Sequence, residues 1–252
     1  MLLTIDLGNT CVKLGLFDKD KQLSFNYFPT SEKDYKGQIL QFIYKAGVRE
    51  EQIDDCIMSC VVPTIKASMI SLIQNLLGIT PKEINVSEDY GIKIGVDDPN
   101  EVGQDILVMC AYAHSLYHRN LLICSLGTCS VFNYVDDIGV FKSCVIAPGF
   151  KKMAEVLYTS SEQLQEFKQE KRNTFLATNT IDAMNVGFYN GYIGMLEYLI
   201  NNMKKEINKD LFVVACGGDT KDIAPYTNVF DVVEVDFVTK GLNFIYNRYY
   251  RG

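Results

Sequence analysis

The sequence contains only two histidines, His114 and His118, which stand four residues apart. A zinc site would therefore have to recruit remote ligands, and catalysis by a histidine acid or base has few candidates. None of the eight cysteines belongs to a Cys-x-x-Cys pair, and most lie in apolar stretches. This arrangement favours reduced thiols in the core over a disulfide framework.

Long apolar stretches are also missing. No segment approaches the roughly 20 apolar residues that a helix needs to cross a bilayer, and residues 1–5 resemble a strand rather than a charged leader. Basic residues are outnumbered, with 24 Lys and Arg against 31 Asp and Glu and a formal net charge of −7. Without a dense basic segment, a nucleic-acid surface is disfavoured. We expect a soluble cytoplasmic protein with neither nucleic-acid nor membrane partners.

Three familiar catalytic motifs are absent. The chain has no G-x-x-x-x-G-K-S/T phosphate loop, no G-x-G-x-x-G dinucleotide motif and no G-x-S-x-G nucleophile elbow. These absences argue against P-loop kinases, Rossmann dehydrogenases and α/β-hydrolases.

What the sequence does contain is regular apolar spacing. The 252 residues are 48% apolar and 22% charged, enough to bury one large core or two modest ones. In the first part of the chain the spacing predicts strands at 2–6, 11–17 and 23–28, followed by a helix at 32–46. A strand at 56–61 and a second helix, which ends at Gly78, come next. The order βββαβα is typical of a mixed sheet covered by helices.

The second part of the chain opens with a repeat. Residues 121–129 match residues 2–11 in having a buried strand, a glycine turn and the start of a second strand. Further on we expect a helix, a strand and a terminal helix, at 179–207, 211–215 and 238–249. The repeat predicts two related halves, 1–116 and 117–252, with a ligand in the cleft between them. Chance similarity between two apolar hairpins is the alternative explanation.

The first hairpin carries residues that suit a phosphate ligand. Asp6 ends a buried strand, and Gly8, Asn9 and Thr10 form a turn whose N–H groups and hydroxyl can hold phosphate oxygens. Asp6 could bind a divalent cation such as Mg²⁺, directly or through water, and Lys13 adds positive charge. An ordinary Asx-type hairpin turn would explain the turn residues, but not the acid at the end of the strand.

The second hairpin offers a matching turn at Gly127 and Thr128. Two such turns facing each other would form an ATP clamp. Ser125 stands where the first hairpin has its acid, so a metal would be held mainly by the first half. Gly217 and Gly218 follow another apolar strand and allow close approach of a flat base, although a glycine pair is also an ordinary turn.

Asp105 lies at the start of the helical pattern 106–117, where the helix dipole favours a negative charge. An acid in the first turn of a helix is common and needs no function. The functional alternative is a carboxylate that accepts a proton from an attacking hydroxyl, or orients it, in phosphoryl transfer.

Taken together and in order, these motifs resemble the type III pantothenate kinases, of the acetate-and-sugar-kinase/Hsp70/actin superfamily. The likeness runs over nearly the whole chain. It rests on Asp6, Gly8, Asn9, Thr10 and Lys13, on residues 59–63, on Pro99, Gly103 and Asp105, on Gly127 and Thr128, on Pro148 and Gly149, on Asn179 and Thr180, on Gly217 and Gly218, and on Gly241 and Leu242.

The resemblance implies an α/β fold of two duplicated RNase H-like (actin-like ATPase) domains, each a mixed five-stranded sheet flanked by helices, with an interdomain cleft. It implies ATP-dependent phosphorylation of pantothenate to 4'-phosphopantothenate, the first step of coenzyme A biosynthesis, with Asp105 as base or hydroxyl-orienting group. ATP and Mg²⁺ would be bound by the two turns and Asp6, with Gly217 and Gly218 on the adenosine side. Substrate-side positions would be Val96, Gly103, Gln104 and Thr180.

The chain departs from the family pattern at several positions. Ile106 replaces an arginine that helps to hold the substrate, and Val96 or Asp97 falls where a tyrosine is expected. If pantothenate binds, another cation such as Lys93 or Lys142 would compensate. Two other functions therefore stay open: a catalytically altered nucleotide-binding or regulatory homologue, and a kinase for another small hydroxyl compound.

Two further expectations come from the resemblance alone. The family implies a monovalent cation, K⁺ or NH₄⁺, but Ser125 and Asn133 replace acids of the second phosphate motif. The family also implies a homodimer through the helix after Asn179. That helix has an apolar stripe, namely Met184, Phe188, Tyr192, Met195 and Tyr198. The stripe would serve a dimer or, as the alternative, the core of a single chain.

Overall fold

A computed structural model describes residues 1–251 of the chain. Two compact units are present. The first consists of Met1–His118, Val135–Ser143 and the chain from Asp236 onward, and the second of Arg119–Tyr134 and Cys144–Val235. The units are thus discontinuous in sequence, whereas the two predicted halves, 1–116 and 117–252, are continuous. That division into related halves stays a prediction.

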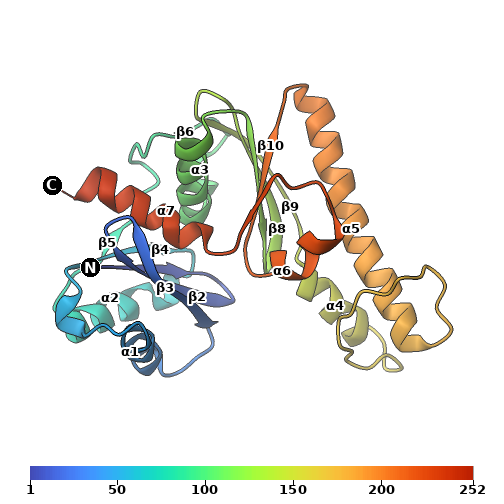
Figure 1. The fold of residues 1–252 in the computed structure, drawn as a ribbon, viewed down its shortest axis with the longest axis horizontal. Coiled ribbons are helices and arrows are strands. Elements are labelled where there is room, and N and C mark those ends of the chain that lie inside the picture. Colours follow the sequence, from blue (N-terminus) through green and yellow to red (C-terminus); the bar gives the residue numbers. More distant parts are fainter. Residues whose placement is uncertain (252) are drawn as a thin grey trace. The chain divides into compact units, whose positions relative to one another are not determined.

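The first unit is built on a five-stranded mixed sheet with the order β3-β2-β1-β4-β5 (Figure 1). Its strands are β1 (Leu2–Leu7), β2 (Cys11–Asp18), β3 (Lys21–Pro29), β4 (Asp55–Cys60) and β5 (Lys82–Glu83). β2 runs antiparallel to both β1 and β3, and β4 and β5 extend the sheet in parallel with β1. This is the mixed sheet that the apolar spacing predicts, with strand ends within about two residues of the predicted positions.

Alternate residues of these strands point to opposite faces of the sheet. Leu3, Ile5 and Leu7 of β1 join a core with α1 (Tyr35–Lys45) and α2 (Pro63–Leu77). Helix α1 begins after Asp34, whose side chain accepts a hydrogen bond from the N–H of Gly37. The residues between, Thr4 and Asp6, point to the other face.

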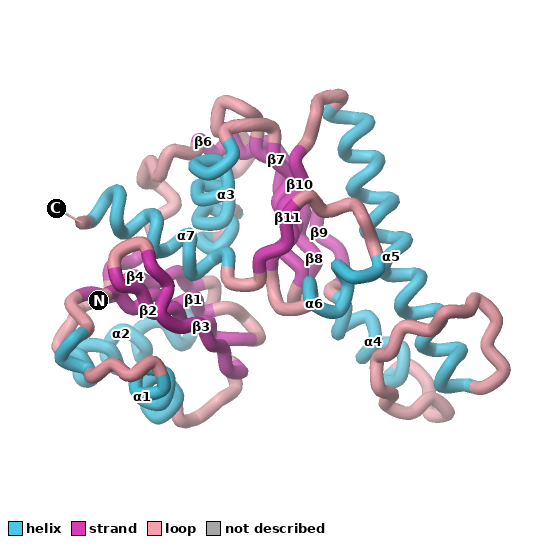
Figure 2. The backbone as a smooth tube through the Cα atoms, in the orientation of Figure 1, coloured by secondary structure: helices cyan, strands magenta, loops and turns pink. Residues whose placement is uncertain are grey.

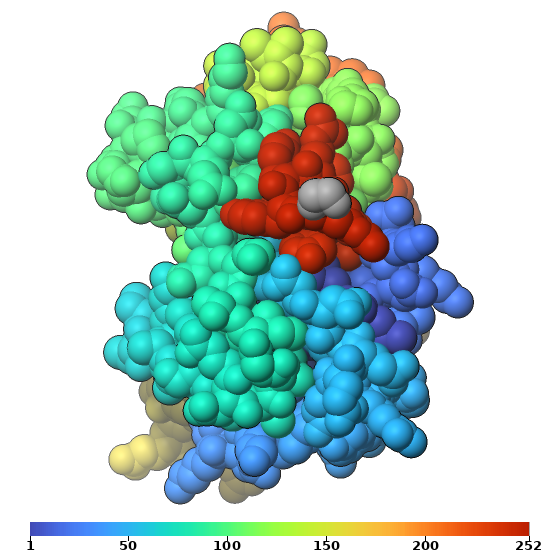
Figure 3. All heavy atoms as spheres, turned by 90° about the vertical axis from the view of Figure 1, so that its left-hand side faces the viewer, coloured from blue at the N-terminus to red at the C-terminus, as the bar shows by residue number. Residues whose placement is uncertain are grey.

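That other face is covered by α3 (Gln104–Tyr117) and α7 (Phe237–Ile245), as Figures 1 and 2 show. A π-helical turn, η4 (Tyr246–Tyr250), continues α7. Gly15 of β2 lets α7 approach, because a Cβ at Gly15 would lie 3.0 Å from Cβ of Thr239. The space-filling view in Figure 3 shows the C-terminal segment (red) at the surface. The hydroxyl of Tyr250 in this segment lies 2.9 Å from that of Tyr90.

The second sheet has six strands in the order β11-β10-β7-β8-β9-β6, one strand more than predicted. They are β6 (Lys93–Ile94), β7 (Leu121–Leu126), β8 (Cys129–Val135), β9 (Val140–Pro148), β10 (Phe212–Cys216) and β11 (Val232–Glu234). The additional strand is β6, which pairs with Val140 and Phe141 of β9. With two residues it is too short to show an alternating pattern, so apolar spacing could not predict it.

The core of the second unit lies against the long helix α5 (Thr180–Ile207). Asn179 caps the start of α5, and its Oδ1 accepts a hydrogen bond from the N–H of Asp182. The unit also contains α4 (Phe150–Thr159) and α6 (Thr220–Ile223). None of the helices within residues 1–251 combines the length and the apolar content needed to cross a bilayer.

The apolar stripe on α5 belongs mainly to this core. Met184, Phe188 and Tyr192 are at most 5% exposed and pack with the buried side chains of the second sheet. Met195 packs partly against the same core, whereas Tyr198 is 69% exposed. The stripe as a whole therefore cannot be a surface for a second chain, and single-chain packing explains most of it.

Candidate active site

Strand register brings three polar residues of the first unit side by side. In the antiparallel pair of β1 and β2, Asp6 lies opposite Lys13. In the parallel pair of β1 and β4, Asp6 lies opposite Ser59. All three side chains therefore point to the same face of the sheet, the one covered by α3 and α7.

The hydrogen bonds of Asp6 hold its carboxylate in place. The Ser59 hydroxyl donates to Oδ1 of Asp6 over 2.7 Å, and Lys13 Nζ donates to Oδ2 over 2.8 Å. Asp6 is only 1% exposed. Burying a carboxylate is costly unless it is paired and hydrogen-bonded, and both oxygens are. The charge at the end of β1 is thus kept in the fold by two partners from neighbouring strands.

The turn after β1 is tight and faces solvent. The N–H of Gly8 donates to the carbonyl of Cys11 over 3.1 Å, and a Cβ on Gly8 would lie 2.9 Å from that oxygen. Thr30, which directly follows β3, makes two hydrogen bonds to this turn. Its hydroxyl donates to the Gly8 carbonyl over 2.7 Å, and its N–H donates to the Thr10 carbonyl over 2.8 Å. Asn9 and Thr10 are exposed. The turn is therefore anchored at its base, and its tip is open to solvent.

Helix α3 starts beside this group. Gln104 Oε1 accepts a hydrogen bond from the N–H of Cys60 over 2.7 Å, which ties the start of the helix to the end of β4. Gly103 is the N-cap residue, and a Cβ there would lie 2.6 Å from Oδ1 of Asp105. Gly103 thus leaves room for the Asp105 carboxylate in the first turn of α3.

The surroundings of Asp105 raise the pKa of its carboxyl group to about 6. Burial is the largest cause, and the negative charge of Asp6 adds to it. Lys13 and the backbone N–H groups of Asp105 and Ile106 act in the opposite direction. Asp105, Asp6 and Lys13 therefore form one electrostatic group. A carboxylate with a pKa near 6 can accept a proton at neutral pH more readily than an ordinary aspartate.

In the second unit, the Gly127–Thr128 turn joins β7 to β8 and lies against the start of α4. The Gly127 N–H donates to the carbonyl of Cys129 over 3.1 Å. Gly149 is the N-cap residue of α4, and a Cβ there would lie 1.9 Å from the Gly127 carbonyl oxygen. The positive end of the α4 dipole therefore lies beside this turn, an arrangement that favours an anion.

The glycine pair lies at the same end of β7. Gly217 has a φ of +97°, and a Cβ there would lie 2.3 Å from the carbonyl oxygen of Leu126. The N–H of Asp219 donates to that carbonyl over 3.2 Å. A Cβ on Gly218 would meet nothing within 4 Å. The three glycine motifs of the second unit, at 127, 149 and 217, are thus brought together.

Three residues at these sites are absent from the predicted set of ligand-binding residues. Ser59 holds Asp6, and the sequence signals it only as part of the family-like segment 59–63, which by itself assigns Ser59 no role. In the second unit Lys151 Nζ lies 3.1 Å from Oδ1 of Asp219, which is 4% exposed. Burial raises the pKa of Asp219, and Lys151 opposes that rise. No local pattern joins residues 151 and 219, so this pair emerges only from the fold.

The remaining predicted residues lie elsewhere. Val96 is partly buried in the loop after β6, and Thr180 is exposed at the first position of α5. Lys93 is exposed, and Lys142 Nζ lies 3.5 Å from Asp136. None of these four is held by a hydrogen bond to Asp6 or Asp105 within residues 1–251.

A chain with these two mixed sheets and their helices has the fold of the sugar kinases and actin-like ATPases. A Sinorhizobium meliloti protein assigned as a 2-dehydro-3-deoxygalactonokinase matches with a TM-score of 0.61 at 10% identity, over 99% of this chain and 97% of its own. The activator of 2-hydroxyisocaproyl-CoA dehydratase from Clostridium difficile matches with a TM-score of 0.52 at 10% identity, over 96% of this chain and 92% of its own. These likenesses show the fold.

The sequence identifies the family. The profile of the Type III pantothenate kinases matches residues 2–202. The Type III pantothenate kinase of Bifidobacterium longum subsp. infantis is 32% identical to this chain, over 98% of this chain and 99% of its own length. The chain belongs to the type III pantothenate kinase family.

Proposed function

We propose that the protein transfers the γ-phosphoryl group of ATP to the primary hydroxyl of pantothenate, forming 4'-phosphopantothenate and ADP in the first step of coenzyme A biosynthesis. The observation that carries this proposal is the Asp6–Lys13–Ser59 group with Asp105 beside it. The identity of the acceptor, pantothenate, is inferred from membership of the family. Phosphoryl transfer depends mainly on positioning and charge stabilisation, which is what these residues offer.

Each unit contributes one turn to the phosphates of ATP. The first is Gly8–Thr10, with Lys13 as the cation, and the second is Gly127–Thr128, backed by the N-terminus of α4. The open space above Gly218 suits the adenosine portion. Backbone N–H groups in tight turns are a common way of binding phosphate.

Asp6 fits a Mg²⁺ ion that arrives with ATP. Within residues 1–251, no group of three or more His, Cys, Asp or Glu side chains is arranged to hold a metal by itself. Both oxygens of Asp6 are engaged by Ser59 and Lys13, so Asp6 would hold the ion through water. When bound, Mg²⁺ neutralises charge on the phosphates.

Asp105 would act on the acceptor hydroxyl. As the hydroxyl oxygen bonds to the γ-phosphorus and the bond to ADP breaks, the hydroxyl proton passes to Asp105, or Asp105 orients the hydroxyl. Gly103, Gln104, Val96 and Thr180 would line the acceptor side. Gln104 does so while its side chain holds Cys60.

The cation and the dimer belong to the same proposal. Ser125 and Asn133 supply neutral groups where acids would hold K⁺ or NH₄⁺, so we infer that turnover needs neither ion.

We also infer a homodimer in which the exposed apolar side chains of the second unit take part. They include Phe175, Leu176 and Tyr198, which are 80%, 86% and 69% exposed. Sedimentation tests this inference: a species of single-chain mass would contradict it.

The function is tested by incubating the purified protein with ATP, Mg²⁺ and pantothenate and analysing the products by mass spectrometry. We expect pantothenate to gain one phosphate, Asp105→Asn to abolish the product, and Glu101→Gln, an exposed neighbouring acid, to keep it. ATP binding without turnover by the folded protein would instead identify a nucleotide-binding or regulatory homologue. ADP release with other small alcohols but not with pantothenate would identify a kinase for a different acceptor.

A further inference from the structure

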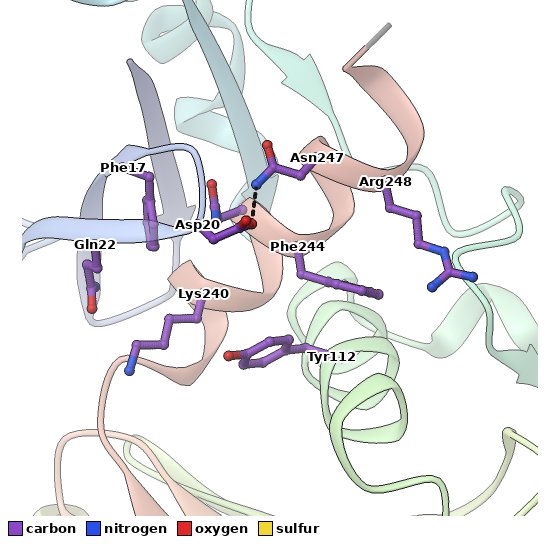
Figure 4. Close-up of a pocket in the computed structure, with 9 residues that line it drawn as sticks. Phe17, Asp20, Gln22, Tyr112, Lys240, Phe244, Asn247 and Arg248 are labelled. Atoms are coloured by element: carbon purple, nitrogen blue, oxygen red, sulfur yellow. Dashed lines mark hydrogen bonds between the residues drawn. The ribbon is translucent and has the colours of Figure 1, made fainter.

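A cavity of about 380 Å³ lies in the first unit, on the α7 side of its sheet (Figure 4). It is bordered by the β2–β3 hairpin, by α3 and by α7 with its π-helical turn. Asp105 stands in the first turn of α3, and Tyr112, on the cavity wall, follows seven residues later, about 10 Å along the helix. The wall shares no residue with the Asp6–Lys13–Ser59 group. The volume is within the range of small-ligand sites.

Two buried polar atoms without hydrogen-bond partners belong to residues of this wall. Within residues 1–251, three buried side-chain atoms lack a partner, and two of them are Gln22 Nε2 and Asn243 Oδ1. Asn243 is only 6% exposed. Unpaired buried amides are rare in folded proteins because each forgoes its hydrogen bond to water. Here one atom is a donor and the other an acceptor, so a ligand that offers an acceptor to Gln22 and a donor to Asn243 would satisfy both.

Aromatic rings form another part of the wall. Phe17 lies on the hairpin side, and Tyr112 of α3 and Phe244 of α7 lie opposite, as Figure 4 shows. The Tyr112 and Phe244 rings have centroids 5.9 Å apart with their planes tilted by 42°. Faces of this kind favour a flat ring as ligand.

The charged groups around the cavity favour an anion. The Arg248 guanidinium lies 5.9 Å from the Phe244 ring centroid, and no carboxylate pairs with it within residues 1–251. Lys240 Nζ lies 3.2 Å from Asp236. The acid of the wall is Asp20, which accepts a hydrogen bond from Asn247 over 3.0 Å. An anionic group of the ligand would therefore find Arg248 available for charge-assisted hydrogen bonds.

We propose that this cavity is a binding site for a small phosphate monoester with a flat nitrogen heterocycle, of the size of a pyrimidine nucleoside monophosphate. The ring would lie against Tyr112 and Phe244, its edge would pair with Gln22 and Asn243, and its phosphate would bind Arg248. A uracil ring has the required edge, because its N–H lies between two carbonyl oxygens. The site is separate from the ATP-binding residues, and the inference does not rest on the proposed kinase activity.

The test uses the full chain and uridine monophosphate as the probe. The sequence has no tryptophan, so Phe244→Trp places a single indole reporter in the cavity wall. We expect saturable quenching or shift of its fluorescence, and a matching heat of binding for the unmodified protein in calorimetry. Uridine and inorganic phosphate, which each carry half of the recognised groups, should bind at least about tenfold more weakly.

Three substitutions locate the binding. Arg248→Gln, at an exposed residue, should weaken binding about tenfold or more, whereas Lys13→Met in the ATP-binding set should leave it unchanged. Asn243→Leu, which removes the Oδ1 acceptor at similar side-chain size, should weaken it as well, with folding checked by circular dichroism. The proposal is overturned by the absence of heat at millimolar probe. It is also overturned if Lys13→Met abolishes binding while Arg248→Gln does not, because the probe would then occupy the ATP site.

Discussion

The β1–β2 hairpin and the β7–β8 hairpin differ in the groups that they would offer to a phosphate ligand. In the first unit the end of β1 carries charged side chains, with Asp6 held between Lys13 and Ser59. In the second unit the end of β7 carries Ser125, which lies opposite Cys216 of the parallel neighbour β10. Here glycines at 127, 149 and 217 let backbone segments approach closely. One hairpin therefore supplies charge and the other supplies backbone groups.

This difference assigns distinct consequences to substitutions in the two units. Charge changes in the first unit should alter catalysis and its pH dependence, whereas added side-chain volume in the second should alter folding and nucleotide binding. The following experiments separate these effects, beginning with the largest.

Removal of the Asp105 carboxylate should have the largest effect. We expect Asp105→Asn to lower kcat by about 100- to 10,000-fold, the range for loss of a general base. Asp219→Asn removes a buried acid of the second unit instead. It should lower kcat by less than about tenfold, since no proton transfer depends on it. Steady-state rates of the two variants decide the comparison, and equal losses would contradict it.

The pH dependence of the rate should follow Asp105. Its pKa of about 6 means that the carboxyl becomes protonated as pH falls through 6. We therefore expect kcat/KM to fall about tenfold per pH unit below that value. Lys13 lowers the pKa of Asp105, so Lys13→Met should shift the acid limb to higher pH. A limb that stays in place in this variant would show that Asp105 does not control it.

The raised pKa of Asp105 also makes stability depend on pH, in the direction opposite to the rate: stability falls as pH rises. Because the folded protein binds the proton of Asp105 more tightly than the unfolded chain does, this group contributes stability that is fully present below its unfolded pKa, near 4. That contribution is lost as pH rises through about 6. Asp105→Asn should therefore lose less stability at pH 8 than at pH 5, relative to the unmodified protein, in urea denaturation.

A side chain added at Gly149 should lower the free energy of unfolding, an effect smaller than the loss of rate expected for Asp105→Asn. A Cβ there would lie 1.9 Å from the Gly127 carbonyl oxygen, so Gly149→Ala must move the turn. We expect a loss of about 1–3 kcal/mol in the free energy of unfolding. Gly218→Ala is the matched control, because its Cβ would meet nothing within 4 Å, and it should change stability by no more than about 0.5 kcal/mol. Equal losses in thermal or urea unfolding would contradict the close packing.

Replacement of Na⁺ by K⁺ or NH₄⁺ should have the smallest effect. With Ser125 and Asn133 in place of acids, the initial rate should be the same in all three salts at equal ionic strength. A clear increase in K⁺ would contradict our inference and would indicate a cation site made of neutral oxygens.

The elements that the sequence predicts are those long enough to show a period. Helix α5 was expected at 179–207 and starts at Thr180 after its Asn179 cap, and the mixed order of the first sheet followed from the strand and helix patterns. Strands β5, β6 and β11 have two or three residues and give no periodic signal. Helix α1 starts at Tyr35, three residues after the predicted 32, because Asp34 caps it.

For the candidate site, too, the sequence predicts local features but not contacts between distant segments. Asp6, Lys13 and Asp105 are recognisable because each is a charged residue at the end of an element or next to a glycine turn. The contact of Ser59 with Asp6 depends on the register between strands 53 residues apart, and that of Lys151 with Asp219 on two distant segments. Neither contact can be predicted from the residues that are neighbours in the sequence. Likewise, α7 joins the first unit although it lies at the other end of the chain.

The central claim is that the charged hairpin and the glycine hairpin bind the same ATP molecule. Calorimetric titration of ATP with Mg²⁺ into the unmodified protein, Lys13→Met and Thr128→Val tests it directly. We expect one ATP per chain, and a loss of affinity of about tenfold or more in each variant. Two ATP molecules per chain, or full affinity in either variant, would contradict the claim.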